Sequence, residues 1–119
     1  MFSANSPESD YEVYNKEIKH MMWYCRFQWH SHTTREQIAK RTLEQHQATG
    51  NRRPQILKGW YNLAGGGAGF LLLETNDPRE VTAFLQPYMD LVSWDVHAAY
   101  AVEYEQQIQQ FQQLAGQSR

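Results

Sequence analysis

Two short stretches of the chain alternate between apolar and polar side chains, and two more are apolar, aromatic-rich runs; both patterns are typical of β-strands. These predicted strands are residues 20–29, 55–63, 69–75 and 92–98. In the first and last strands, one face carries the apolar side chains of Trp23, Cys25, Phe27, Trp29, Trp94, Val96 and Ala98. The other face of the same strands carries Tyr24, Arg26, Gln28, Ser93, Asp95 and His97. We therefore expect a sheet with large side chains on both faces.

The second and third predicted strands flank a glycine-rich turn. Four of the five residues from Gly65 to Gly69 are glycine, which reaches positive φ without steric cost. The two strands are therefore predicted to form a β-hairpin. Gly59, inside the second strand, indicates a bulge or a close approach by another backbone.

The first predicted helix follows the first strand. Thr33 and Glu36 have the spacing of a capping box, which predicts a helix start at that point. The helix is expected to run to about Thr49, because Gly50 then supplies a C-terminal stop.

The second predicted helix follows the third strand. Asn76 or Asp77 can cap it, and Pro78 suits its first turn. Its core-facing stripe has helical spacing and consists of Val81, Phe84, Leu85 and Tyr88. Pro87 should kink or shorten this helix.

From about residue 99 the pattern is helical again. A narrow apolar seam runs along a surface otherwise rich in Gln and Glu, and it consists of Ala101, Tyr104, Ile108, Phe111 and Ala115. The seam spans about two heptads, too little for an independent coiled coil. We expect this helix to dock on its own domain, on a second subunit or on a different protein.

The order of these elements is β-α-β-β-α-β with an added helix, the plan of a ferredoxin-like α+β fold. It predicts a polar extension at 1–19, a ferredoxin-like domain at 20–98 and a Gln-rich helix at 99–119. Both helices should cover one face of a four-stranded antiparallel sheet. The other face must carry Phe70 and Leu72, or their neighbours Leu71 and Leu73. An apolar open face favours a homodimer in which two sheets face each other.

Net charge and cysteine content indicate which partners and which cellular compartment to expect. A net charge of −2 argues against nucleic acid as the main partner. The local basic cluster of Lys40, Arg41, Arg52, Arg53 and Lys58 is expected to be a solvated helix end and loop. The lone Cys25 excludes an intrachain disulfide and fits a reducing compartment. Without an apolar membrane-spanning run or a signal-peptide core, we predict a cytoplasmic protein that does not bind membranes.

Several motifs together resemble a family of small bacterial proteins of unknown function. They are the T-x-x-E helix start, G-W-Y, G-x-G-F-x-L-x-E-T-x-D-P and D-L-x-x-W-x-V-x-A. The match covers residues 22–98, and the matching positions include Gly59, Trp60, Gly69, Phe70, Glu74, Thr75, Asp77 and Pro78. The family's usual V-x-P appears here as Val96-His97-Ala98, so its proline is missing.

This resemblance implies membership of the dimeric α/β-barrel superfamily. That superfamily includes cofactor-free monooxygenases, haem-degrading enzymes, lactone isomerases and amino-acid-sensing regulatory domains. The resemblance therefore implies a dimer more strongly than it implies any one activity.

The candidate catalytic residues lie on neighbouring strands. Asp95 and His97 share a strand face, and Tyr24 and Arg26 occupy the corresponding face of the first strand. Enclosed by a partner, these groups could bind a polar ligand or transfer a proton. The alternative is an Arg26–Asp95 ion pair that satisfies polar groups at a dimer interface.

The candidate ligand-binding residues are aromatic: Trp29, Trp60, Tyr61, Tyr88 and Trp94. They could line a pocket for a flat ring, or they could simply form the core. His30 and His32 do not make a metal site by themselves, because zinc usually takes three or four protein ligands. The glycine run lacks the spacing of a phosphate-binding loop. We therefore expect no metal and no cofactor.

Two functional hypotheses follow. The first is a homodimeric module, without catalysis, that binds a small ligand or a protein. The second is a cofactor-free oxygenase or isomerase in which His97 is the acid/base, Asp95 orients it, and Arg26 or Tyr24 polarises a carbonyl. The second hypothesis requires a closed pocket beside those side chains.

Overall fold

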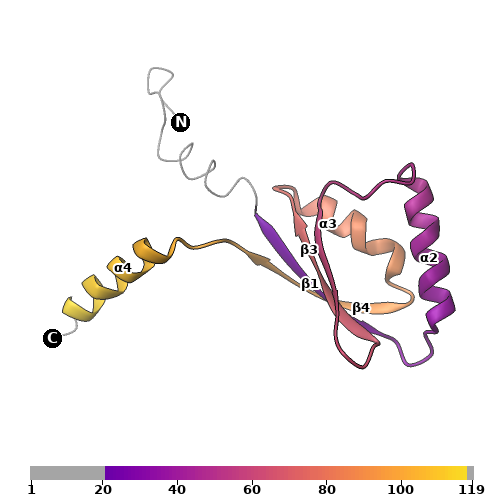
Figure 1. Ribbon diagram of the computed structural model, residues 1–119, viewed down its shortest axis with the longest axis horizontal. Helices are drawn as coiled ribbons and strands as arrows, with labels where there is room; N and C mark the ends of the chain where they lie inside the picture. Colours follow the sequence, from indigo (N-terminus) through magenta and orange to yellow (C-terminus); the bar gives the residue numbers. More distant parts are fainter. Residues whose placement is uncertain (1–20, 118–119) are drawn as a thin grey trace, which may run out of the picture.

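A computed structural model describes residues 21–117, and the side chains of residues 21–116. The predicted N-terminal extension, 1–19, lies outside the described residues. The element order is β1 (Met22–Trp29), α2 (Arg35–Ala48), β2 (Leu57–Asn62), β3 (Ala68–Glu74), α3 (Pro78–Leu85), the 3-10 turn η1 (Gln86–Tyr88), β4 (Val92–Ala99) and α4 (Tyr104–Gln117). Figure 1 shows α2 and α3 beside the sheet and α4 apart from it, beyond the end of β4.

The four strands form one antiparallel sheet in the order β2-β3-β1-β4. β1 lies between β3 and β4, so that Arg26 is opposite Phe70 on one side and Asp95 on the other. This arrangement confirms the predicted α+β class and is compatible with a ferredoxin-like fold. The register of β2 shifts between Leu57 and Gly59, which confirms the predicted irregularity near Gly59.

Alternation along the strands divides the sheet into a helix-facing side and an open side. Core residues Cys25, Phe27, Leu71, Leu73 and Val92 point toward the helices, where Val81, Leu85 and Leu91 meet them. Phe70 and Leu72 are therefore the pair on the open side, and both are only partly buried. Tyr24 and Tyr61 flank the Phe70 ring there, with centroids 5.1 and 4.8 Å away.

Cys25 lies at the centre of the core with no exposed surface. Burial raises the pKa of its thiol to about 11, so the thiol stays protonated at neutral pH. Its Sγ lies 3.7 Å from the carbonyl oxygen of Trp23. Cys25 is therefore a packing residue rather than a nucleophile.

The starts of α2 and β2 lie one and two residues later than predicted. The capping box forms one residue later than predicted: the Thr34 hydroxyl accepts from the Gln37 amide at 3.1 Å, and the Gln37 side chain accepts from the Thr34 amide at 2.9 Å. The Thr33 hydroxyl instead donates to the Leu91 carbonyl at 2.6 Å. β2 begins at Leu57, because the Leu57 amide closes a turn on the Pro54 carbonyl at 3.1 Å.

The terminal helix begins at Tyr104 rather than near residue 99. β4 continues to Ala99, and the Glu103 carboxylate then accepts from the amides of Glu105 and Gln106 at 3.2 and 3.0 Å. The side chain thus caps the helix at its N-terminus. As predicted, Pro87 follows a shortened helix: α3 ends at Leu85 and gives way to η1.

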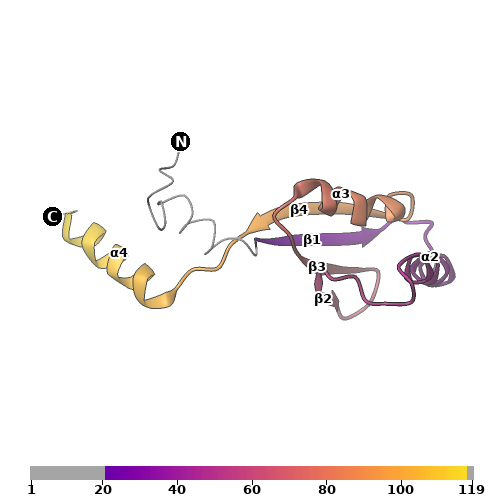
Figure 2. The same cartoon turned by 90° about the horizontal axis from the view of Figure 1, so that it is seen from above.

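α4 extends away from the domain, as Figure 2 shows from above. Tyr104 is 70% exposed, and Phe111 and Leu114 are exposed by more than half. The predicted seam therefore does not dock on the described part of its own domain. Within residues 21–117, no helix is long and apolar enough to cross a membrane.

Candidate functional site

A cavity of about 850 Å³ lies between the helix-facing side of the sheet and the helices α2 and α3. Its wall is mainly apolar and includes six aromatic side chains, those of Phe27, Trp29, Trp60, Phe84, Tyr88 and Trp94. The cavity exists because α2 stands away from the sheet: its residues bury no side chain completely, although Ile38 and Thr42 line the space. A helix that leaves such a space open in front of aromatic side chains makes a concave, mainly apolar site.

Four of the five aromatic residues predicted to bind a ligand lie in this wall: Trp29, Trp60, Tyr88 and Trp94. Tyr61 does not line the cavity. It stacks on Phe70 on the open side, because neighbouring residues of a strand point to opposite faces. The alternation of the strand was the sequence signal that could have separated Trp60 from Tyr61.

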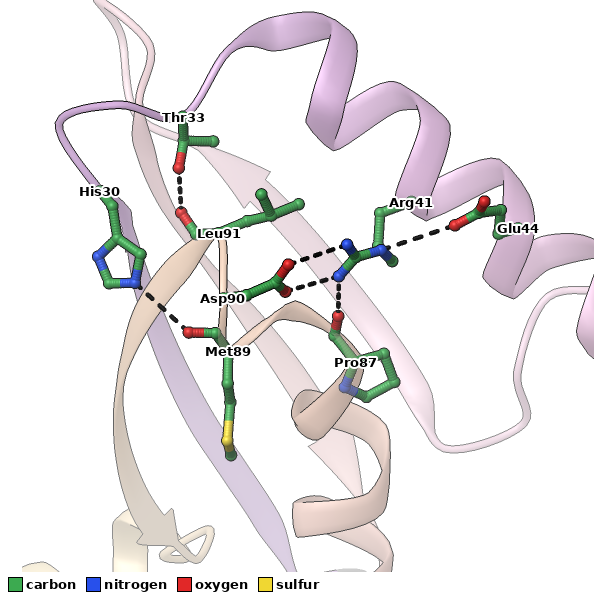
Figure 3. Close-up of polar contacts among 8 residues, drawn as sticks. All are labelled: His30, Thr33, Arg41, Glu44, Pro87, Met89, Asp90 and Leu91. Atoms are coloured by element: carbon green, nitrogen blue, oxygen red, sulfur yellow. Dashed lines mark hydrogen bonds and ion pairs between the residues drawn. The ribbon is translucent and has the colours of Figure 1, made fainter.

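An ion pair joins α2 to the segment between η1 and β4 (Figure 3). The Arg41 guanidinium donates to both carboxylate oxygens of Asp90, at 2.6 and 2.9 Å, and also to the Pro87 carbonyl. Glu44 lies 3.6 Å from Arg41 Nε. A planar guanidinium bound to both oxygens orients its helix as well as attracting it. This pair therefore links the helix that forms one wall of the cavity to the segment before β4.

The ion pair shifts the pKa values of both partners. The hydrogen bond from Arg41 holds the pKa of Asp90 below its ordinary value of 3.8, and the bond to Asp90 raises the pKa of Arg41. Two neighbouring contacts support the same region in Figure 3: Thr33 donates to the Leu91 carbonyl, and His30 Nε2 lies 3.4 Å from the Met89 carbonyl oxygen. Sequence analysis missed Asp90, because 49 residues separate it from Arg41.

We expect Asp90→Asn to lower the Tm at neutral pH and to lose this effect in acid. The folded-state pKa of Asp90 is depressed, so its contribution is present above the ordinary value of 3.8 and disappears as the pH falls through the lower folded-state value. Thermal unfolding of both proteins from about pH 7 to about pH 3 measures the difference. In an Arg41→Gln background, Asp90→Asn should have little further effect. If Asp90→Asn lowered the Tm by the same amount in the Arg41→Gln background as in the wild type, the assigned ion pair would be contradicted.

Polar side chains lie among the aromatic ones around the cavity, and they include His46, Arg53 and Glu80. Arg53 Nε donates to the Leu57 carbonyl at 3.0 Å. The Glu80 carboxylate accepts a hydrogen bond from the Thr75 hydroxyl. The indole nitrogen of Trp94 is buried with no hydrogen-bond partner among the described residues. The cavity thus combines a large apolar wall with a few polar groups that could orient a ligand.

The candidate catalytic residues lie on the other side of the sheet. His97 Nε2 is 3.0 Å from Asp95 Oδ1, and both side chains are about two-thirds exposed. Arg26 is opposite Asp95 and Tyr24 is opposite His97 in the sheet register. The structure thus brings the four residues together, but they do not line the cavity beneath α2. Among residues 21–117, no Arg26–Asp95 ion pair forms, and Asp95 contacts His97.

His30 and His32 lie after β1, with ring centroids 5.6 Å apart. Within the described part of the chain, no three His, Cys, Asp or Glu residues are placed to hold a metal ion. The two histidines belong to the β1–α2 connection, where the amide of His30 donates to the Leu91 carbonyl at 3.0 Å. Their observed contacts are those of a structural turn.

A comparison with protein-family models matches residues 21–114 to the family described as a domain of unknown function (DUF3303). The match includes the whole sheet, the helices that surround the cavity and most of α4. Neither the curated proteins nor the solved structures contain a match.

Proposed function

The chain belongs to this DUF3303 family, whose description names no activity, and we propose from its geometry a homodimeric module that binds a small, flat, mainly apolar ligand without catalysis. The observation that carries the proposal is the cavity of about 850 Å³ beneath α2. Its volume lies within the roughly 300–1,000 Å³ typical of small-molecule sites.

The wall of the cavity supports a ligand with an aromatic or similarly flat body. Trp60 is 54% exposed despite its size, and Trp29, Phe84, Tyr88 and Trp94 are each only partly buried. Aromatic side chains offer large contact areas and stack on flat rings. A ligand placed against them would remove apolar surface from water at about 25 cal/mol per Å². This gain favours binding over an empty, solvated cavity.

The unpaired indole N–H of Trp94 is a second supporting feature. Buried polar groups normally have a hydrogen-bond partner, and each exception calls for an explanation. Trp94 is part of the cavity wall, and its Nε1 has no partner within the described residues. An acceptor on a ligand that contacts this nitrogen would supply that partner.

The open side of the sheet supports the homodimer. Tyr24, Tyr61, Phe70 and Leu72 form an apolar strip there, and Arg26, Asp95 and His97 lie next to it. Mixed apolar and charged surfaces of this kind are typical of protein interfaces. A second copy placed face to face would cover the strip. Two sheets facing each other are also the arrangement that the resemblance to the dimeric α/β-barrel superfamily implies. The exposed Tyr104 and Phe111 of α4 offer a separate surface for a protein partner.

One observation favours the alternative, a cofactor-free oxygenase or isomerase. The contact between His97 and Asp95 is that of an imidazole oriented by a carboxylate, an arrangement used in general base catalysis. Such chemistry needs an enclosed reaction site, which a second copy of the sheet would have to provide above His97 and Arg26.

Native mass spectrometry of the freshly purified protein, with an absorbance spectrum of the same sample, tests the proposal. We expect a mass of twice the 14.0 kDa chain, with an additional small molecule retained on part of the sample. The added mass identifies the ligand class. A monomer would contradict the sheet-to-sheet dimer. A dimer that neither retains nor takes up any small aromatic compound would contradict the binding function.

A further inference from the structure

We propose that the ligand of the cavity is an anion, a flat apolar compound with one carboxylate, and that Arg53 binds this carboxylate at the edge of the cavity. This inference rests on the proposed binding function and specifies its ligand. Arg53 belongs to the segment between α2 and β2 and lines the same cavity as the aromatic wall. Its charge is therefore placed where the polar end of a bound aromatic compound would lie.

The guanidinium of Arg53 is held at one nitrogen and open at the others. Its Nε donates to the Leu57 carbonyl at 3.0 Å, at the first residue of β2. Within residues 21–117, its two terminal nitrogens make no hydrogen bond and no ion pair. Terminal guanidinium N–H groups are suited to bidentate binding of a carboxylate, and the Nε bond reduces the freedom lost on binding. Arg53 is thus oriented before the ligand arrives.

The nearby end of α2 does not need this charge. Three carbonyl groups of its last turn already accept hydrogen bonds: the amides of Thr49 and Asn51 donate to Gln45 and His46, and the amide of Gly50 donates to Gln47. The Thr49 hydroxyl donates to the same end of the helix, 2.9 Å from the His46 carbonyl oxygen. A helix end completed by its own backbone leaves the guanidinium available to another acceptor.

The other charged side chain of the cavity, Glu80, already has a structural partner. Its carboxylate accepts from the Thr75 hydroxyl and lies in the first turn of α3, where a negative charge is favourable. In the basic cluster predicted from the sequence, Arg41 is paired with Asp90 and Lys58 with Glu74. Within residues 21–117, Arg53 is the member of that cluster that lines the cavity and whose terminal N–H groups make no hydrogen bond or ion pair. This difference selects an anionic ligand over a cationic one.

Isothermal titration calorimetry with three probes of one shape tests the charge preference. The probes are 2-naphthoate, the neutral 2-naphthamide and the cationic 2-naphthylmethylamine. We expect the full-length protein to bind 2-naphthoate about tenfold more tightly than the amide, because the carboxylate alone gains charge-assisted hydrogen bonds. The preference should decrease as salt is added, since Arg53 is exposed.

Two matched variants assign the preference to Arg53. Arg53→Gln should weaken naphthoate binding about tenfold and leave amide binding unchanged, while Arg52→Gln should change neither by more than about twofold. Arg52 is the adjacent exposed arginine and does not line the cavity. Arg53→Lys retains the charge and should keep part of the preference. Far-UV circular dichroism confirms that each variant is folded.

The outcomes separate this inference from the function on which it rests. Equal binding of acid and amide, or equal losses in the Arg52 and Arg53 variants, would overturn the role of Arg53 and leave a ligand-binding cavity. Tighter binding of the amine, weakened by Glu80→Gln, would overturn it in favour of a cationic ligand. If the folded protein binds none of the probes, the proposed function itself fails, and the anion inference fails with it.

Discussion

Gly69→Ala is expected to destabilise the domain by about 2–3 kcal/mol, the upper part of the range for overpacked cores. Gly69 is buried in β3, between β1 and β2. A Cβ atom at this position would lie 2.6 Å from the Phe27 ring and would also meet the backbone carbonyl oxygen of Tyr61. The ring occupies the space that a side chain would need, and the carbonyl belongs to the β2 backbone. To remove both steric clashes, the β2–β3 hairpin and the Phe27 ring would have to move together.

The free energy of unfolding, from urea titrations followed by circular dichroism, measures this loss. Gly116→Ala is the matched control, because nothing lies within 4 Å of the Cβ that it adds in α4. There the change should stay within about 0.5 kcal/mol of zero, or slightly stabilise the helix. Equal stability of wild type and Gly69→Ala would show that the hairpin does not pack against Phe27 as described. Since Phe27 also lines the cavity, ligand binding should weaken together with stability in this variant.

Thr42→Trp is expected to abolish most ligand binding while keeping the fold. Thr42 is partly buried on α2 and lines the cavity opposite the sheet, so an indole at this position would fill space that a ligand occupies. We expect the affinity for 2-naphthoate or 2-naphthamide to fall by at least about tenfold, which corresponds to about 1.4 kcal/mol. Filling an apolar cavity commonly adds about 0.5–2 kcal/mol of stability, so the Tm should stay constant or rise. Loss of binding with retained stability distinguishes a blocked site from an unfolded protein.

The next residue along the helix provides the control. Leu43 is 59% exposed and does not line the cavity, so Leu43→Trp adds the same side chain to the same helix outside the site. Its affinity for 2-naphthoate or 2-naphthamide should equal that of the wild type. Unchanged binding in Thr42→Trp would place the ligand elsewhere, and the open side of the sheet, beside His97 and Arg26, would then be the next surface to examine.

Local patterns in the sequence predicted most of the fold. The period-2 alternation around Cys25 and Phe27 assigned the faces of β1, because side chains of a strand must alternate. The glycine run after residue 64 predicted the hairpin, and the structure places Gly65, Gly66 and Gly67 at positive φ. Pro87 predicted the early end of α3, since proline cannot continue the hydrogen bonding of a helix. Each of these features depends on neighbours within a few residues.

The residues around the cavity were harder to identify from the sequence than the elements of the fold. Four of the five candidate aromatic residues line the cavity, but Tyr61 was assigned to the same pocket as Trp60 although strand alternation separates them. The capping box also moved from Thr33 to Thr34, because the Thr33 hydroxyl is engaged by a carbonyl 58 residues away. Arg53 was grouped with other basic residues as a solvated loop, and only its place at the cavity edge distinguished it.

The sequence by itself determined the order of the elements, the faces of the strands and the burial of Cys25, since these follow from short-range spacing and side-chain polarity. The tertiary structure alone decided the distance between α2 and the sheet, and with it the cavity. Arg41 contacts Asp90 beside that space, and no local pattern in the sequence predicts a pairing across 49 residues. The tertiary structure also decided that α4 extends away from the described domain. The apolar seam of a helix shows that one of its faces can be buried, but it does not identify the surface that buries it.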